Sequence, residues 1–191
     1  MYTLRMSTQD RLIEATRELL WERGYVGTSP KAIQQHAEVG QGSMYHHFTG
    51  KPDLALTAIR RTADEMREAA GRVLDAPGSA YERISAYLLR ERDVLRGCPV
   101  GRLTMDPEII ANDELREPVD ATITWLRGRL AAIVREGVDA GEFAPGLAPE
   151  DVAASIVATV QGGYVLARAA GSADAFDAGV RGLLTLLAPT A

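Results

Sequence analysis

The stretch Thr28–Leu54, TSPKAIQQHAEVGQGSMYHHFTGKPDL, decides the fold. Its Ser29-Pro30 pair predicts the start of a helix, because serine accepts a bond from a free backbone N–H and proline at the first helical position has none to lose. A short helix over 30–37 should follow, then a turn at 38–40 and a second short helix over 41–48. Two short helices joined by a tight turn are the parts of a helix-turn-helix.

The rest of the chain also has helical spacing of its apolar residues, and the alternation typical of strands is nearly absent. Ser7 followed by Asp10 resembles a capping box, and an apolar stripe then runs to Gly24, which predicts a helix over 7–23. Further helices are predicted over 51–75, 80–95, 101–111, 115–139, 149–170 and 173–187. The expected fold is all-α, with a small three-helix front, a long connecting helix and a larger helical rear.

The composition is that of a globular protein, with 46% hydrophobic and 25% charged residues in a chain of 191. The formal net charge is −5, but it is unevenly distributed. Residues 1–61 hold eight Lys/Arg and six Asp/Glu, a net charge of +2, whereas residues 62–191 hold thirteen and twenty, a net charge of −7. Both lysines, Lys31 and Lys51, lie in the front segment. This asymmetry favours a protein that presents only its front to phosphates.

The remaining sequence features predict a soluble protein of a reducing cytoplasm. The single cysteine, Cys98, excludes an intrachain disulfide framework. The first ten residues, MYTLRMSTQD, lack the apolar core of a signal peptide. The longest uncharged run, Val152 to Ala167, is shorter than the ~20 residues that a membrane span needs.

The stretch quoted above resembles the N-terminal domain of the TetR (tetracycline repressor) family. The matching positions, in the family's order and spacing, are Thr28, Ile33, Ala37, Val39, Gly42, Tyr45, His47, Phe48, Lys51 and Leu54. The resemblance implies a helix-turn-helix DNA-binding domain at 1–52 and a helical effector-binding and dimerisation domain at 53–191. It also implies a homodimer that binds double-stranded operator DNA, as a repressor rather than an activator, and responds to a small-molecule effector.

The second short helix is expected to lie in the major groove, where its first residues reach base edges. Candidate base contacts are Gln41, Gly42, Ser43 and Met44, with glutamine suited to adenine and methionine to a thymine methyl group. Candidate phosphate contacts are Tyr45, His46, His47 and Lys51, with Thr28 and Lys31 anchoring the first short helix. The alternative for Tyr45 is packing alone. Three histidines without a cysteine or acidic ligand at suitable spacing do not indicate a metal site.

The chain departs from the family pattern at four neighbouring positions. Gln34 replaces a small residue, Glu38 a turn glycine, Gly40 a capping serine and Gln41 a frequent lysine. The second helix is therefore less basic than is usual, Glu38 would repel phosphate, and Gly40 caps more weakly than serine by a few tenths of a kcal/mol. We expect modest operator affinity.

The last two long helices form an intersubunit four-helix bundle in family members, and the apolar residues here suit that use. The predicted interface residues are Val152, Ile156, Val160, Gly163, Phe176, Val180, Leu183 and Leu187. The alternative is ordinary core within one protomer. A two-fold dimer predicts a palindromic operator.

An effector pocket is expected between the break at 97–99 and the last helices. The candidate lining residues are Tyr87, Cys98, Met105, Trp125 and Tyr164, which suit an apolar or aromatic ligand. Three other interpretations remain: a core without a pocket, a thiol or electrophile sensor at Cys98 activated by Arg96 or Arg102, and a DNA-binding protein without an effector. An enzyme with Cys98 as nucleophile is disfavoured, because all histidines lie within 36–47 and no general base for Cys98 is evident. No cofactor is expected.

Overall fold

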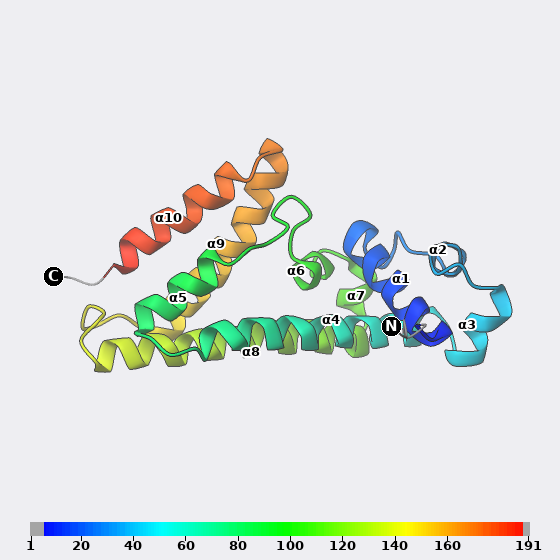
Figure 1. Ribbon diagram of the computed structural model, residues 1–191, viewed down its shortest axis with the longest axis horizontal. Coiled ribbons are helices and arrows are strands. Elements are labelled where there is room, and N and C mark those ends of the chain that lie inside the picture. The colour runs from blue at the N-terminus through cyan, green and yellow to red at the C-terminus, as the bar shows by residue number, and fades with distance from the viewer. Residues whose placement is uncertain (1–5, 189–191) are drawn as a thin grey trace, which may run out of the picture. The chain divides into compact units, whose positions relative to one another are not determined.

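The computed structural model describes residues 6–188, and every regular element in that range is an α-helix, which confirms the predicted all-α class (Figure 1). The helices are α1 (Thr8–Arg23), α2 (Pro30–His36), α3 (Gln41–His47), α4 (Lys51–Leu74), α5 (Ala80–Leu89), α6 (Pro99–Leu103), α7 (Pro107–Ala111), α8 (Asp113–Asp139), α9 (Pro149–Ala170) and α10 (Asp174–Leu187).

The chain divides into two compact units, and neither is continuous in sequence. Unit 1 holds residues up to Asp64 together with Pro99–Asp120, and unit 2 holds Glu65–Cys98 together with the residues from Ala121 onward. The domain boundary expected after residue 52 falls in the first turn of α4, which contributes to both units.

Unit 1 contains the helix-turn-helix, and α1, α2, α3 and α4 begin within one residue of the predicted positions. The hydroxyl oxygen of Ser7 accepts a bond from the Asp10 N–H at 3.1 Å, and that of Ser29 accepts one from the Ala32 N–H at 3.1 Å. Gly40 precedes α3 without a side-chain cap bond. Ile33, Phe48 and Leu54 are buried, as expected for core residues.

A polar network also joins α1 to α4 within unit 1. The Arg61 guanidinium lies 3.1 Å from both the Asp10 and the Glu14 carboxylates. The Ser7 hydroxyl and then Arg61 hold the pKa of the Asp10 carboxyl below its usual value, because both favour the ionised form. The network thus links the first two turns of α1 to the middle of α4.

Asp106 interrupts the single helix that the sequence predicts over 101–111. One carboxylate oxygen caps α7, accepting bonds from the Glu108 and Ile109 N–H groups at 3.1 and 3.4 Å. The other oxygen accepts bonds from the Tyr25 and Val26 N–H groups at 2.7 and 2.9 Å. Asp106 is 7% exposed, so it ties the loop after α1 to the start of α7 from inside unit 1.

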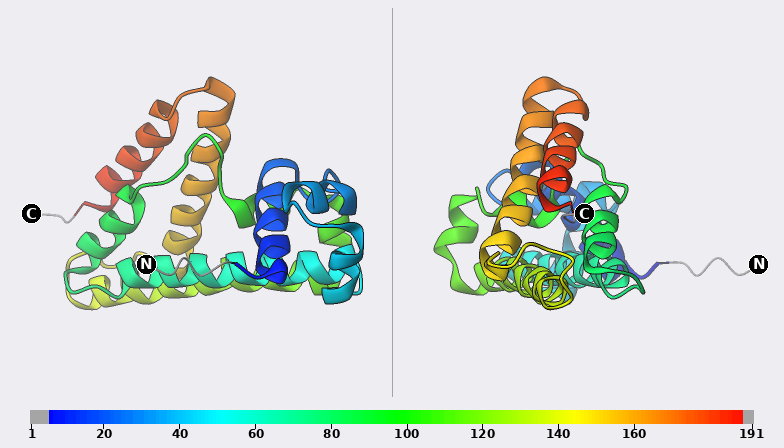
Figure 2. Two further views of the ribbon diagram at one scale, coloured as in Figure 1. Left: turned by 45° about the vertical axis from the view of Figure 1, so that its right-hand side comes forward. Right: turned by 90° about the vertical axis from the view of Figure 1, so that its left-hand side faces the viewer.

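Unit 2 is built around α5, α8, α9 and α10, and α9 and α10 lie side by side (Figures 1 and 2). Helix α5 begins with a complete capping box at Ser79 and Glu82. It ends at Leu89, six residues earlier than predicted, because Arg90 is extended and the Arg92 guanidinium binds the last carbonyls of the helix.

Helix α9, Pro149–Ala170, is long and apolar enough to cross a membrane by length and composition. Its Ala153, Ile156 and Val160 side chains are buried in the core of unit 2. A helix that packs into a protein core on one side and exposes apolar residues on another is also typical of a subunit interface.

Candidate functional site

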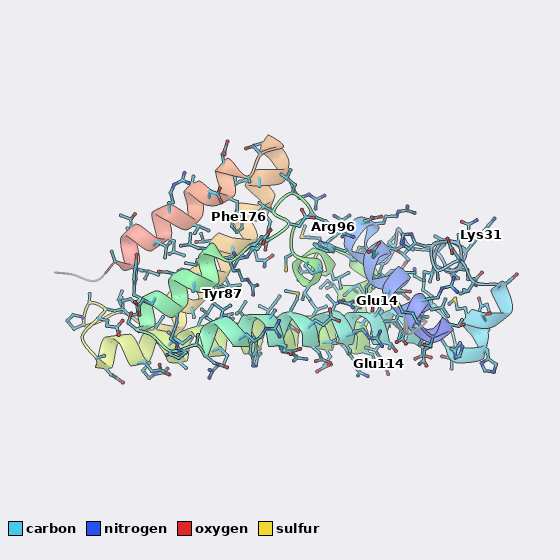
Figure 3. All side chains as sticks on the ribbon, viewed as in Figure 1. Glu14, Lys31, Tyr87, Arg96, Glu114 and Phe176 are labelled. Atoms are coloured by element: carbon cyan, nitrogen blue, oxygen red, sulfur yellow. The ribbon has the colours of Figure 1, made fainter. Side chains whose placement is uncertain are left out.

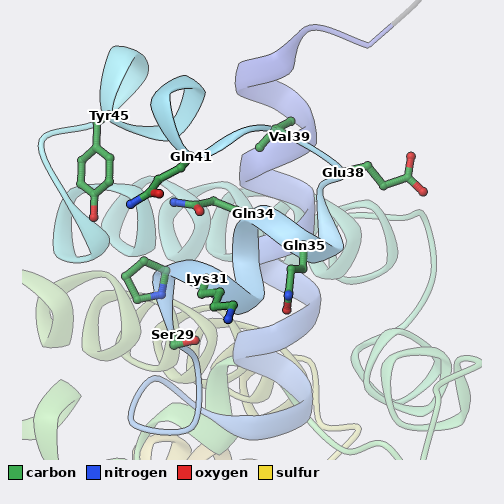
Figure 4. Close-up of a pocket in the computed structure, with 9 residues that line it drawn as sticks. Ser29, Lys31, Gln34, Gln35, Glu38, Val39, Gln41 and Tyr45 are labelled. Carbon is green, nitrogen blue, oxygen red and sulfur yellow. The ribbon is translucent and has the colours of Figure 1, made fainter.

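The helix-turn-helix has a concave surface between α2 and α3, with a volume of about 690 Å³. Gln41 and Tyr45 of α3 face it from one side, and Ser29, Lys31 and Gln34 face it from the other (Figure 4). Its walls are therefore mainly polar, with one large aromatic ring. The described lining holds one cation, Lys31, and one carboxylate, Glu38, and is suited to hydrogen bonding with a polar partner.

Three of the four candidate base contacts lie where a groove can be reached. Gln41 and Gly42 are exposed and Ser43 is half-buried at the start of α3. Met44 is 0% exposed, so the expectation that it contacts a thymine methyl group is corrected. Its sulfur instead accepts a bond from the Gln34 amide at 3.5 Å, which joins α3 to α2 in the core.

The candidate phosphate contacts Tyr45, His46 and His47 are exposed along α3. Tyr45 is 55% exposed, which leaves both its ring and its hydroxyl accessible. The rings of His46 and His47 contact each other edge to face, with centroids 4.9 Å apart. The His36 imidazole pairs with the Glu18 carboxylate at 3.2 Å and is thus not grouped with the other two histidines.

Lys51 is half-buried, and its ammonium group lies 3.8 Å from the centroid of the Tyr25 ring. Burial lowers the pKa of Lys51, and the nearby Glu108 and Asp106 carboxylates oppose that effect. The ammonium group thus packs against this ring at the start of α4, near the positive end of the helix dipole. Lys31 is exposed at the start of α2.

Thr28 has a different role from the one expected. It is 1% exposed, and its hydroxyl donates to the Gly24 carbonyl at 2.7 Å. The side chain thus closes the loop between α1 and α2. The expected phosphate contact by this side chain is corrected.

Glu38 is the one residue other than glycine with positive φ in the described part of the chain, at 52°. This is the position where the family resemblance places a turn glycine, and an L-residue there is strained. Arg11 stabilises the turn, because its guanidinium donates to the Ala37 and Glu38 carbonyls at 2.5 and 2.8 Å. The Glu38 carboxylate lies 3.8 Å from the same guanidinium and remains largely exposed.

Ser29 and Gln35 line the α2–α3 surface but were not predicted as interface residues. Ser29 was identifiable only as a helix cap. Gln35 is exposed one turn after Lys31, and this helical spacing was the signal available in the sequence.

Four of the five candidate effector residues line one cavity in unit 2. Tyr87, Cys98, Trp125 and Tyr164 all contribute to its wall, and Figure 3 marks Tyr87 on α5. Met105 does not, since it belongs to unit 1 and is 84% exposed. The cavity volume is about 40 Å³, little more than the space of one water molecule.

Arginine and tyrosine side chains gather around this cavity. Arg90 lies 4.7 Å and Arg92 lies 5.3 Å from the centroid of the Tyr87 ring. Burial raises the pKa of Tyr164 to about 12, and it also raises the pKa of Tyr87. Both phenols are therefore neutral hydrogen-bonding groups at physiological pH.

The predicted dimer residues lie mostly inside the protomer. Six are buried in unit 2: Ile156, Val160, Gly163, Phe176, Val180 and Leu187. Val152 and Leu183 are half-buried against the same core. A Cβ atom on Gly163 would lie 2.7 Å from the Phe176 ring, so this glycine permits the contact between α9 and α10 of one chain. The assignment of the six buried residues to an intersubunit contact is corrected.

Many of the exposed residues on the same two helices are small or apolar. On α9 and α10 these residues are Ser155, Ala158, Gly162, Val165, Leu166, Ala169, Ala178, Gly182 and Leu186. Val165 is 67% exposed and Leu186 is 84% exposed. Large exposed apolar side chains on neighbouring helices are typical of a protein interface.

Comparison with known proteins covers both units. Residues 12–58 match the family of bacterial regulatory proteins, tetR family, and residues 79–183 match the tetracyclin repressor-like C-terminal domain. The chain is 25% identical over 161 residues to the HTH-type transcriptional repressor DhaR of Mycobacterium sp. (strain GP1). The aligned residues cover 83% of this chain and 81% of that protein.

Solved structures have the same fold. A TetR transcriptional regulator from Chloroflexus aurantiacus matches with a TM-score of 0.83 and 27% identity, over 96% of this chain and 97% of that chain. A cysteine-substituted variant of the TetR-family regulator CifR, solved with a 26-base-pair operator duplex, matches with a TM-score of 0.79 and 23% identity. The match covers 97% of this chain and 100% of that chain.

The exposed polar surface of the helix-turn-helix and the helical second unit define a DNA-binding transcriptional regulator. With more than half of its length matched by the C-terminal family domain, the chain belongs to the TetR family.

Proposed function

We propose that the protein is a homodimeric repressor that binds a palindromic operator and is released by a small molecule bound in the unit 2 cavity. The observation that carries this proposal is the surface between α2 and α3, where Lys31, Gln41 and Tyr45 present polar and aromatic groups together. An α-helix fits the major groove, and polar groups on the preceding helix can then meet the backbone.

Within this proposal, Gln41 and Ser43 contact base edges and the residues around them contact phosphate. A glutamine amide can bond adenine at two positions, which gives sequence preference. Gly42 has open space where a Cβ would be, so the DNA can approach the backbone there. Tyr45, His46, His47, Lys31 and Lys51 supply the phosphate contacts, which orient the helix without reading sequence.

The exposed side of α9 and α10 is the proposed dimer contact. Gly162 and the small residues near it permit close approach of the partner, and Val165, Leu166 and Leu186 supply apolar surface to bury. This contact also accounts for the apolar character of α9 in a soluble, cytoplasmic protein. A two-fold dimer sets two α3 helices one DNA turn apart, roughly 34–36 Å, on a palindromic site.

The proposed signal passes along the chain from the cavity to unit 1. Cys98 lines the cavity, and α6 begins at the next residue. Further along, Asp106 is bonded to the loop after α1. Displacement of the cavity wall at Cys98 therefore pulls on a segment that is attached to the helix-turn-helix. An effector that binds only the displaced state shifts the population away from DNA binding.

Selection of bound fragments from the source genome tests the DNA-binding part. We expect a two-fold symmetric site, with Lys31→Ala lowering the slope of log affinity against log salt by about 1. Tyr45→Ala should weaken binding, whereas Val26→Ala, a change at a similarly exposed residue of unit 1, should not. An asymmetric site, or an unchanged salt slope for Lys31→Ala, would contradict the proposed contacts.

A further inference from the structure

The cavity in unit 2 has a positively charged wall. Two arginines, Arg67 and Arg90, line it, and no Asp or Glu is among its described lining residues. The rest of the wall is aromatic, aliphatic or neutral and polar, with Trp125, Leu126 and Val160 forming an apolar part. The described lining of this cavity therefore carries cationic side chains and no anionic ones.

Arg90 has no ion-pair partner in the described part of the chain. Its guanidinium lies against the Tyr87 ring, 4.7 Å from the centroid. A second guanidinium, that of Arg92, lies 5.3 Å from the same centroid and donates to the Tyr87, Leu88 and Arg90 carbonyls. Its Nε atom is buried and makes no hydrogen bond within residues 6–188.

The two guanidinium groups lie beside one aromatic ring, and neither has a carboxylate partner in the described part of the chain. The carbonyl groups at the end of α5 offset part of the positive charge of the guanidinium groups, because the negative end of the helix dipole lies there. The remaining cost of burying a cation is reflected in the pKa of Arg92, which burial lowers. An anion in the cavity would meet the Arg90 guanidinium, which lines it and has no carboxylate partner among the described residues, and a charge-assisted bond to guanidinium is stronger than a neutral one.

We propose that the effector is a small organic monoanion whose carboxylate faces Arg90 and whose apolar body packs against Trp125. This inference rests on the proposed function, in which the cavity receives the effector. It narrows the ligand from any apolar molecule to an acid with an apolar or aromatic body.

The volume of the cavity adds a mechanical consequence. About 40 Å³ holds little more than one water molecule, so a carboxylic acid with an apolar body must part the walls to enter. Binding of such a ligand is therefore coupled to displacement of the helices that line the cavity.

Fluorescence of the full-length Trp21→Phe variant tests the proposal, because Trp125 in the cavity wall is then the only tryptophan. The probes are phenylacetate and hexanoate, each paired with its neutral primary amide. We expect saturable changes in Trp125 emission with the acids and affinities at least about tenfold lower for the amides. Arg90→Gln should lower acid affinity about tenfold without changing amide affinity, and Arg90→Lys should retain part of it.

Arg72→Gln is the matched control, because Arg72 is an exposed arginine that pairs with Glu68 outside the cavity. It should leave acid affinity unchanged. Equal binding of acid and amide, equal affinity in Arg90→Gln, or no saturable change with either acid would overturn the anion proposal.

Operator binding, measured in parallel, separates this proposal from the proposed function. If neutral compounds release DNA and acids do not bind, the anion proposal fails and effector-controlled repression stands. If acids bind at Trp125 in an Arg90-dependent manner but operator affinity does not change, the cavity is an anion site and the release mechanism fails.

Discussion

Replacement of Asp106 by alanine should destabilise unit 1 by about 3 kcal/mol. Loss of the α7 cap contributes about 1 kcal/mol, the typical effect of removing a capping aspartate. Loss of the bond from the Tyr25 N–H to a charged acceptor contributes about 2 kcal/mol, because that N–H is buried and would be left without a partner. The Val26 N–H lies next to an exposed side chain, so water can replace its bond at little cost.

The assay is urea unfolding of the full chain in a Trp125→Phe background, where Trp21 on α1 is the only tryptophan and reports on unit 1. Asp113→Ala is the control, because the Asp113 carboxylate is 90% exposed and pairs with Arg116 at the surface. That change should cost less than about 0.5 kcal/mol. A loss below about 1 kcal/mol for Asp106→Ala would refute the reasoning, since the cap alone is worth that much.

Three further changes follow from the geometry. Gly162→Leu should convert the proposed dimer to folded monomer in analytical ultracentrifugation, because the protomer leaves open space there and the larger side chain would block only the partner. Gly163→Ala should instead lower the melting temperature, since its Cβ would meet Phe176 within the protomer. Glu38→Gly should stabilise unit 1 by about 0.5–1 kcal/mol in urea unfolding and increase operator affinity, because it removes a strained residue and a negative charge; reduced stability would contradict the strain. For Tyr164, burial raises the pKa from 10.0 to about 12, so the wild type should lose stability relative to Tyr164→Phe as the pH rises through that window and not below it. A constant difference in unfolding free energy from pH 8 upward would show that the hydroxyl is not buried in its neutral form.

Local signals predicted most of the fold. The serines at positions 7, 29 and 79 cap the helices that they were expected to cap, because a cap depends on a hydrogen bond within four residues. The prediction of one helix over 101–111 was wrong, although Asp106-Pro107 offered a signal: the residue before proline is disfavoured in helical geometry. The far end of α5 was not predictable, since it depends on how Arg92 folds back on the carbonyls.

The candidate site was predictable in position and less so in orientation. A helix of seven residues, such as α3, makes about two turns, and the sequence alone did not show that Met44 would face Gln34 in the core. The orientation of helix α9 could not be predicted for a different reason, because both of its sides are apolar. The pattern therefore could not tell which side packs on α10 of the same chain and which is left exposed.

The division of the chain has a consequence for protein engineering. Unit 1 is assembled from two separate stretches, and residues 99–120 supply the Asp106 carboxylate that closes it. A chimera that transfers only the first 64 residues to another regulator would leave the Tyr25 N–H without its acceptor. A functional graft of this DNA-binding specificity therefore requires both stretches, or a recipient with an equivalent carboxylate after its sixth helix.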